Sequence, residues 1–198
     1  MKFILASSSP RRRELLPRLQ TPFDIIIPDV DESIIPPDGN PETYCTALAE
    51  LKANDISQHY PNHLVIGSDT IVVLNDQIMG KPADKSQAQK MLRSLSGKTH
   101  HVYTGVCLKW AERNIHHLFA EITMVTFREL SEADINHYIA SCPPYDKAGA
   151  YGIQDWSAVF VKEIKGCYDN VVGFPISRFY EELKKLGINL LDSLSEAS

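Results

Sequence analysis

"HLVIGSDTIVVL", residues 63–74, is the most strand-like stretch of the chain and decides its fold class. A strand of this sequence is apolar on both faces except at Ser68, Asp69 and Thr70, which is typical of a strand buried inside a sheet. The "ND" pair that follows is a turn signal and predicts a return into a second, paired strand that ends at Lys81. The stretch therefore predicts a central strand that carries one carboxylate.

Short strands and a broken helix are predicted before this central strand. "FILAS" (3–7) and "FDIII" (23–27) have the apolar character of buried strands. Between them, Ser9 is expected to cap a helix whose first residue is Pro10, a position where no backbone donor is needed. Pro17 lies inside that helix and should kink it or end it early.

Two further helices have clear start signals. Asn40 and Pro41 begin a helix whose apolar residues follow helical spacing, with Lys52 at the rim of its apolar stripe. Asp84 is expected to cap another helix, which Gly97 closes. Both helices should pack their apolar sides against the sheet.

The rest of the chain mixes strands and helices. Residues 101–110 and 117–127 alternate like antiparallel strands, and residues 157–174 are interpreted as a hairpin around Gly166. Ser131 and Asp134 resemble a capping box and predict the start of one helix. A final helix is predicted by an apolar stripe of Ile176, Phe179, Tyr180, Leu183 and Leu186.

No repeat, low-complexity block or linker divides the sequence, so one domain over residues 1–198 is predicted, with residues 192–198 as a frayed tail. Because strands and helices do not strictly alternate, the pattern predicts an α/β or α+β domain with a mixed, twisted sheet.

Charge and cysteine usage narrow the class of protein. The net charge of −5 disfavours nucleic-acid binding by the molecule as a whole, although residues 1–20 are locally basic. The four cysteines are far apart and form no CxxC pair, which argues against a zinc site or a disulfide scaffold. Because no leader or membrane-length apolar run is present, the sequence predicts a cytoplasmic protein without a membrane partner.

Three consecutive cations, Arg11, Arg12 and Arg13, fall in the first turn of the helix that begins at Pro10. That end of a helix already carries partial positive charge, so each cation costs about 0.3 to 1 kcal/mol unless an anion compensates it. A phosphate group bound at the helix start would do so. A solvated basic patch is the simpler alternative.

Carboxylates and further cations lie near the ends of other predicted elements. Asp69 inside an apolar strand needs a cation, a metal or hydrogen-bond donors to compensate its desolvation. Asp69 and Glu32 supply carboxylates for a hard cation, and Lys52 and Lys81, with the arginines, supply cations for phosphates, the two halves of a metal-assisted phosphoryl site. Taken singly, each residue has a simpler interpretation: a strand-end aspartate, a solvated glutamate, a snorkelling lysine and a turn lysine.

Other catalytic motifs are absent from the sequence. It contains no P-loop, HExxH or GxSxG pattern, and the seven histidines lack ligand spacing and are interpreted as structural. The glycine-rich stretch at residues 145–158 contains Gln154, whose amide can both donate to and accept from a base edge. A connecting loop is the alternative.

Taken together, these segments resemble the Maf family of nucleoside triphosphate pyrophosphatases. The resemblance spans nearly the whole chain in family order and rests on "ILASSSPRRRELL" (4–16), "VDE" (30–32), "ALAELKA" (47–53), "IGSDTIV" (66–72), "GKP" (80–82), "LSGKTHHVYTGV" (95–106), "DKAGAYGIQ" (146–154) and "NVVGFP" (170–175). The chain departs from the family pattern after Gln154, where "DWSA" replaces small, glycine-containing residues.

The resemblance implies an elongated α/β fold similar to inosine triphosphatase, with two lobes around a cleft, and a homodimer. It implies hydrolysis of dTTP and UTP to the monophosphate and pyrophosphate with a divalent cation, Mg²⁺ or Mn²⁺. By family position, the catalytic and metal-side residues are Asp69, Glu32, Lys52 and Lys81, and the substrate-binding residues are Ser9, Arg11, Arg12, Thr70 and Gln154. Asp69 and Glu32 would hold the metal.

The sequence leaves two questions open, the role of Asp69 and the possibility of a function without turnover. Asp69 either accepts the proton of the attacking water or orients a water that the metal activates. The family is also associated with septum formation and division arrest, and with keeping non-standard nucleotides out of nucleic acids. A nucleotide-sensing regulator without significant turnover is therefore the alternative function.

Overall fold

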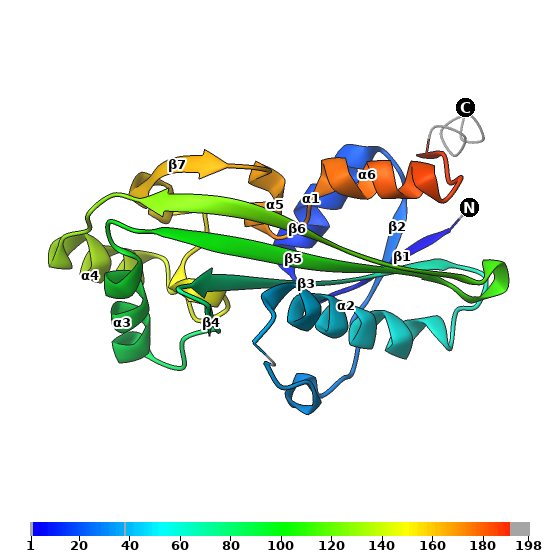
Figure 1. Cartoon of the computed structure of the whole chain (residues 1–198), viewed down its shortest axis with the longest axis horizontal. Coiled ribbons are helices and arrows are strands. Elements are labelled where there is room, and N and C mark those ends of the chain that lie inside the picture. The colour runs from blue at the N-terminus through cyan, green and yellow to red at the C-terminus, as the bar shows by residue number, and fades with distance from the viewer. Residues whose placement is uncertain (1, 38, 191–198) are drawn as a thin grey trace.

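One mixed sheet of seven strands forms the centre of the computed structural model, which describes residues 2–37 and 39–190 (Figure 1). The strand order is β2-β1-β3-β5-β6-β7, and β4 pairs with β3. β1 is parallel to β2 and β3, and the other pairs are antiparallel. The strands are β1 Phe3–Ala6, β2 Phe23–Ile26, β3 Leu64–Leu74, β4 Gln77–Met79, β5 Thr99–Trp110, β6 Ile115–Phe127 and β7 Val161–Lys165.

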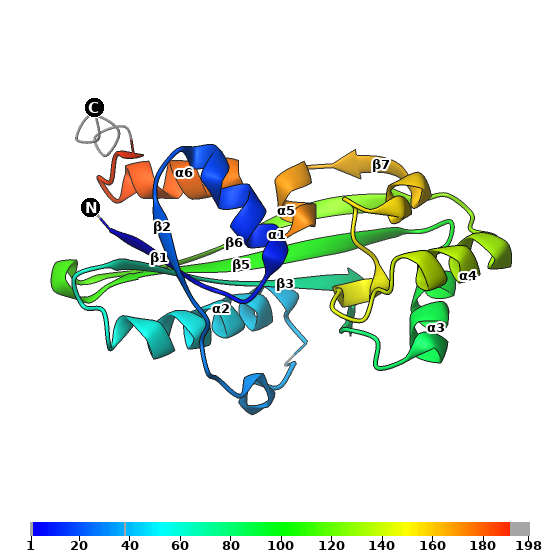
Figure 2. The same cartoon turned by 180° about the vertical axis from the view of Figure 1, so that it is seen from behind.

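Helices cover both faces and one end of this sheet (Figures 1 and 2). The helix α2 lies on one face, whereas α1, α5 and α6 lie on the other, and α3 and α4 pack together at the far end of β5 and β6. The helices are α1 Pro10–Leu15, α2 Pro41–Ser57, α3 Lys85–Leu95, α4 Glu132–Ser141, α5 Tyr168–Val172 and α6 Ile176–Lys185. The predicted mixed α/β sheet is thereby confirmed.

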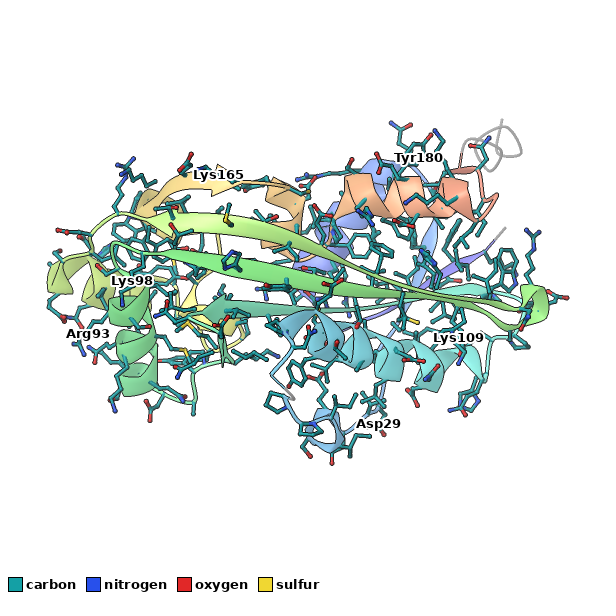
Figure 3. All side chains as sticks on the ribbon, in the orientation of Figure 1. Asp29, Arg93, Lys98, Lys109, Lys165 and Tyr180 are labelled. Atoms are coloured by element: carbon teal, nitrogen blue, oxygen red, sulfur yellow. The ribbon has the colours of Figure 1, made fainter. Side chains whose placement is uncertain are left out.

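Side-chain hydrogen bonds join neighbouring elements, α3 to α4 and α2 to β5. Arg93 on α3 makes two hydrogen bonds to the Glu132 carboxylate of α4, at 2.6 and 2.8 Å (Figure 3). Lys109 on β5 donates to Asn54 on α2. Among the described residues, no helix is long and apolar enough to cross a membrane.

Two glycines let α2 lie unusually close to the sheet. A Cβ atom on Gly67 of β3 would stand 2.0 Å from the backbone oxygen of Ala49, and one on Gly105 of β5 would stand 2.4 Å from the backbone of Cys45. The backbones of strand and helix therefore touch at these points. This approach fixes the height of α2 above Asp69, which pairs with Gly105 in the ladder.

Most predicted helix signals are confirmed. The Asn40 side chain accepts from the backbone amides of Glu42 and Thr43, Asp84 caps α3, and Ser131 forms the predicted capping box. The helix α1 ends at Leu15 and continues as a 3₁₀ turn that contains Pro17. The prediction for Ser9 is wrong: it stands at the cap position, but its side chain makes no cap hydrogen bond, and its backbone N–H donates to the Ser7 hydroxyl.

The predicted hairpin around Gly166 is also wrong. Its first half is β7, which pairs with β6, but after Gly166 the chain forms the short helix α5. The reason is the buried Asn170, whose amide donates to the backbone oxygens of Val102 and Glu121. These bonds hold the segment across β5 and β6 as a helix. The tail predicted at residues 192–198 lies outside the described residues.

His100 and the two buried cysteines, Cys45 and Cys107, have pKa values that do not suit catalysis at neutral pH. His100 is buried, contacts the Tyr151 hydroxyl at 2.8 Å, and has a pKa that burial lowers to about 4. Cys45 and Cys107 are buried free thiols, and burial raises the pKa of each to about 12. These thiols therefore stay protonated and inert at neutral pH.

A buried carboxylate on α6 makes the stability of this fold sensitive to acid. The side chain of Glu182 is 3% exposed and lies 2.6 to 2.9 Å from the cationic groups of Arg178 and Lys185 and from the imidazole of His117. Burial by itself would raise the pKa of Glu182, but the hydrogen bonds from these three partners outweigh it and lower the pKa to about 2. A lowered folded-state pKa stabilises the fold above the usual carboxyl range, and that stability is lost as pH falls through about 2.

We therefore expect Glu182→Gln to destabilise the protein at pH 7 and to remove much of this acid sensitivity. Urea unfolding at several pH values between 7 and 2 should show the gap between wild type and variant narrowing as pH falls. Glu181→Gln, on the exposed side of the same helix, is the matched control and should stay close to wild type. A gap that is constant with pH would contradict the assignment.

Candidate active site

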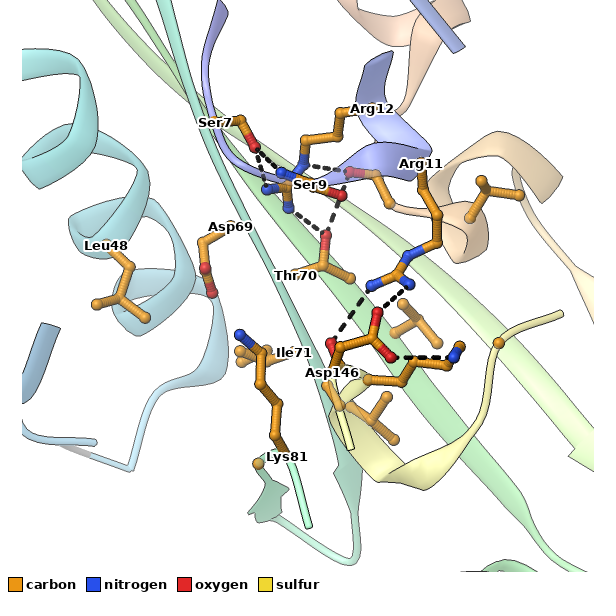
Figure 4. A pocket seen from close by; sticks show the side chains of 18 of the residues that line it. Ser7, Ser9, Arg11, Arg12, Leu48, Asp69, Thr70, Ile71, Lys81 and Asp146 are labelled. Atoms are coloured by element: carbon orange, nitrogen blue, oxygen red, sulfur yellow. Dashed lines mark hydrogen bonds and ion pairs between the residues drawn. The ribbon is translucent and has the colours of Figure 1, made fainter. Parts of the chain in front are cut away.

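A cavity of about 540 Å³ lies between the start of α1, the middle of β3, α2 and the loop that follows α4 (Figure 4). All nine residues predicted for the site line it: Ser9, Arg11, Arg12, Glu32, Lys52, Asp69, Thr70, Lys81 and Gln154. They come from segments far apart in the sequence, from Ser9 to Gln154, which the fold brings to one cavity.

Arg12 is held inside the cavity wall. Its guanidinium donates to the backbone oxygen of Gly173 at 2.9 Å, to the Ser7 hydroxyl at 3.2 Å and to the Thr70 hydroxyl at 2.9 Å. Burial is the largest influence on its pKa and lowers it, and the nearby Asp69 carboxylate opposes this effect. Three of its five N–H donors have these partners, so the group is fixed while two donors remain for a ligand.

Arg11 faces the loop on the other side of the cavity. Its guanidinium contacts the carboxylate of Asp146 at 2.9 Å and the backbone oxygen of the same residue at 3.4 Å. Asp146 also accepts from Lys147 at 3.0 Å. Burial by itself would raise the pKa of Asp146, but hydrogen bonds from Lys147 and Arg11 outweigh it and lower the pKa. The pair therefore joins α1 to this loop as an ion pair.

The predicted carboxylates meet at Lys52. Its ammonium lies 2.6 Å from the carboxylate of Asp69 and 2.9 Å from that of Glu32. The interpretation of Lys52 as a snorkelling surface lysine is wrong, since its side chain is only 10% exposed. Desolvation of Asp69 is thus compensated by a cation, as an apolar strand environment requires.

Lys81 and Gln154 are exposed at the mouth of the cavity. Lys81 extends from the segment after β4 toward Asp69 (Figure 4). In the described part of the chain, Lys81 has no ion pair within 4.0 Å, unlike Lys52. A charged ligand can therefore reach its ammonium without first breaking a salt bridge.

Several other residues line the cavity although no sequence pattern had assigned them to the site. Tyr44 and Leu48 lie on the same face of α2 as Lys52, and the four-residue spacing of these three is a signal that could have revealed them. Ser7 and Asp146 could not have been assigned, because each acts through a partner distant in sequence.

The carboxylates of Glu32 and Asp69 meet at Lys52 in the cavity, whereas the third lining carboxylate, Asp146, pairs with Arg11. No group of three or more potential ligands forms a metal site among the described residues. Magnesium at phosphate sites is commonly held by one or two carboxylates together with substrate phosphates and water. The donor set therefore fits a divalent cation that binds jointly with a polyphosphate.

Known proteins are similar to this chain in sequence over most of its length. A model of the family described as Maf-like protein matches residues 2–186. The dTTP/UTP pyrophosphatases of Bacillus cereus (strain AH187) and Bacillus anthracis are each 47% identical to this chain, over 96% of it and 97% of their own length. A nucleoside-triphosphatase / dITP/XTP pyrophosphatase of Mycobacterium abscessus is similar in structure with a TM-score of 0.44 and 13% identity, covering 66% of this chain and 76% of that one.

Proposed function

Because the chain belongs to the Maf-like protein family, we propose that it is a dTTP/UTP pyrophosphatase that hydrolyses its substrate to the monophosphate and pyrophosphate. The observation that carries this proposal is the single cavity shared by the arginines at the start of α1 and the carboxylate of Asp69. A polyphosphate needs cations and a metal-side acid in one place, and this cavity offers both.

The triphosphate is bound by the cationic side of the cavity. Arg12 offers its remaining N–H donors from a fixed position, and Lys81 offers an ammonium that has no ion pair with any described residue. Ser9 lines the same wall with a hydroxyl that does not cap α1, which leaves it available to a phosphate oxygen. Each charge-assisted contact contributes about 1.5 to 3 kcal/mol.

Glu32 and Asp69 would hold a divalent cation, Mg²⁺ or Mn²⁺, which when bound neutralises charge on the triphosphate and activates water. Lys52 lies between the two carboxylates and holds both in place before the substrate binds. Glu32 is half-exposed, so it can adjust when a ligand enters.

The reaction is an attack of water on the α-phosphorus, and the bond to the oxygen that bridges the α- and β-phosphorus breaks. Pyrophosphate leaves with that oxygen. One oxygen of Asp69 accepts from Lys52, and the other orients the attacking water and takes its proton.

Base selection falls to Gln154, Thr70 and Arg11, which line the same cavity. The residues that depart from the family pattern after Gln154, Asp155 and Trp156, do not line this cavity. Asp155 accepts from the backbone N–H of Ser157, and Trp156 packs its ring against His137, Tyr138 and Phe160 on the side of α4. We therefore expect the usual pyrimidine preference of the related pyrophosphatases.

A nucleotide panel tests this function. Purified protein with Mg²⁺ is expected to release pyrophosphate from dTTP and UTP faster than from purine triphosphates. Tight nucleotide binding without pyrophosphate release would instead support a nucleotide-sensing regulator of septum formation. A single domain over residues 1–198, a homodimer and a cytoplasmic location stay predictions.

Lys81→Met is expected to raise the KM for dTTP by about 10- to 100-fold, because it removes one charge-assisted phosphate contact. Its thermal unfolding should match wild type, since Lys81 is exposed and has no ion pair in the described part of the chain. Steady-state kinetics and a melting curve check both points. Lys85→Met, an exposed lysine at the start of α3, is the control, and an unchanged KM for Lys81→Met would remove Lys81 from the site.

A further inference from the structure

A chain of hydrogen bonds runs from Arg12 at the cavity into the core of the sheet. Arg12 donates to the Thr70 hydroxyl at 2.9 Å, the hydroxyls of Thr70 and Thr104 lie 2.9 Å apart, and Thr104 donates to the backbone oxygen of Asn170 at 3.3 Å. Thr70 and Thr104 are direct neighbours across the β3–β5 ladder. Thr104 lies behind the cavity wall and is completely buried.

The direction of this chain follows from counting hydrogens. The Asn170 oxygen can only accept, and it is satisfied when the single hydroxyl hydrogen of Thr104 points at it. Thr104 then accepts from Thr70, which uses the single hydroxyl hydrogen of Thr70. A backbone oxygen of Gly173 at 3.3 Å is the longer alternative acceptor for that hydrogen. In either arrangement Thr70 has no hydrogen left to donate to a substrate.

The inner end of the chain is anchored in the core. The Asn170 amide nitrogen lies 3.0 to 3.3 Å from three acceptors, the backbone oxygens of Val102 and Glu121 and the Thr123 hydroxyl, which share its two hydrogens. Asn170 and Thr123 are both completely buried. The carbonyl that receives the Thr104 hydrogen is thus fixed by β5 and β6, and the chain transmits this fixed position outward.

We propose that Thr104 is a positioning residue for substrate binding, which acts through Thr70 to orient the Arg12 guanidinium toward the phosphates. The proposal rests on the proposed pyrophosphatase function. By setting the direction in which the Thr70 hydroxyl donates, Thr104 turns a lone pair of Thr70 toward Arg12. Thr70, one of the residues assigned to base selection, then affects the substrate through Arg12 or as an acceptor, since its hydrogen is used inside the protein.

Two substitutions separate the hydroxyl of Thr104 from its shape. Thr104→Val keeps the volume and removes the hydroxyl, and we expect it to lower kcat/KM for dTTP about 10-fold, mostly through KM. Thr104→Ser keeps the hydroxyl and should stay within about twofold of wild type. Thr21→Val is the matched control, because Thr21 is 5% exposed, donates to one backbone oxygen and lies outside the cavity lining.

A double-mutant cycle with Thr70→Val tests the connection itself. If Thr104 acts through Thr70, the double variant should be no slower than Thr70→Val alone, because the chain is already cut. Losses that multiply would overturn the proposal, as would a Thr104→Val variant whose KM equals that of Thr21→Val. If Thr104→Val does not fold, Thr104→Ala enters the same cycle. Wild-type protein that releases no pyrophosphate from dTTP would refute the proposed function instead, so the two failures are distinguishable.

Discussion

Asp69→Asn is expected to lower kcat for dTTP by about 1,000-fold, within the range for loss of a group that transfers a proton in the transition state. The amide keeps the shape of the side chain but cannot take a proton from water. Nucleotide binding should persist, because the change removes a negative charge from a cavity that receives a polyanion. It also weakens the hold on Lys52, whose ion pair with Asp69 at 2.6 Å is lost while that with Glu32 at 2.9 Å remains, so its ammonium turns more readily to a phosphate oxygen.

Pyrophosphate release and calorimetric binding of dTTP to the variant check the two halves of this expectation. Asp76→Asn is the matched control, because Asp76 lies in the turn between β3 and β4 with a φ of 61°, a conformation that asparagine also accepts. Full turnover by Asp69→Asn would end the assignment of Asp69. Loss of both binding and turnover would show that Asp69 organises the cavity and does not act on the water.

Gly67→Ala is expected to destabilise the fold by about 3 kcal/mol or more, at the upper end for overpacked interiors. The added Cβ would stand 2.0 Å from the backbone oxygen of Ala49 and 2.8 Å from the backbone nitrogen of Ala53. These are backbone atoms of α2, so no side chain can rotate away. The helix must move off the sheet, and Lys52 on it moves away from Asp69.

Urea unfolding of the variant measures the loss of stability. Gly80→Ala is the control, since an added Cβ there meets nothing within 4 Å, and it should change stability by less than about 0.5 kcal/mol. A Gly67→Ala variant as stable as Gly80→Ala would mean that α2 does not rest on the strand backbone. A folded but destabilised variant should also show reduced turnover, because Lys52 and Asp69 are separated.

The local elements could be predicted where short-range chemistry decides them. The capping side chains of Asn40, Asp84 and Ser131 satisfy amides within three residues, so the sequence alone reveals these helix starts. Pro17 ends α1 for an equally local reason. The hairpin predicted around Gly166 failed because distant partners decide that segment: the Asn170 amide bonds to the backbones of β5 and β6.

The same distinction applies to the site. The sequence named nine residues that line one cavity, because the resemblance to the Maf family, which the family comparison confirms, carries positions as well as residue types. Taken singly, Lys52 also allowed a surface interpretation, which its contacts with Glu32 and Asp69, distant along the chain, exclude. The capping role predicted for Ser9 was wrong. The Arg11 contact with Asp146 joins residues 135 positions apart, beyond the reach of any local pattern.

The sequence by itself determined the type of element at most positions, the family and the chemical groups available for the reaction. Only the tertiary structure decided which group pairs with which: Lys52 with two carboxylates, Arg12 with Thr70 and Gly173, and Thr70 with Thr104. The physical reason is the distance along the chain over which each interaction acts. Propensity and capping act over a few neighbouring residues, whereas the partner of a buried charge or hydroxyl is whichever group the packed sheet and helices bring within about 3 Å.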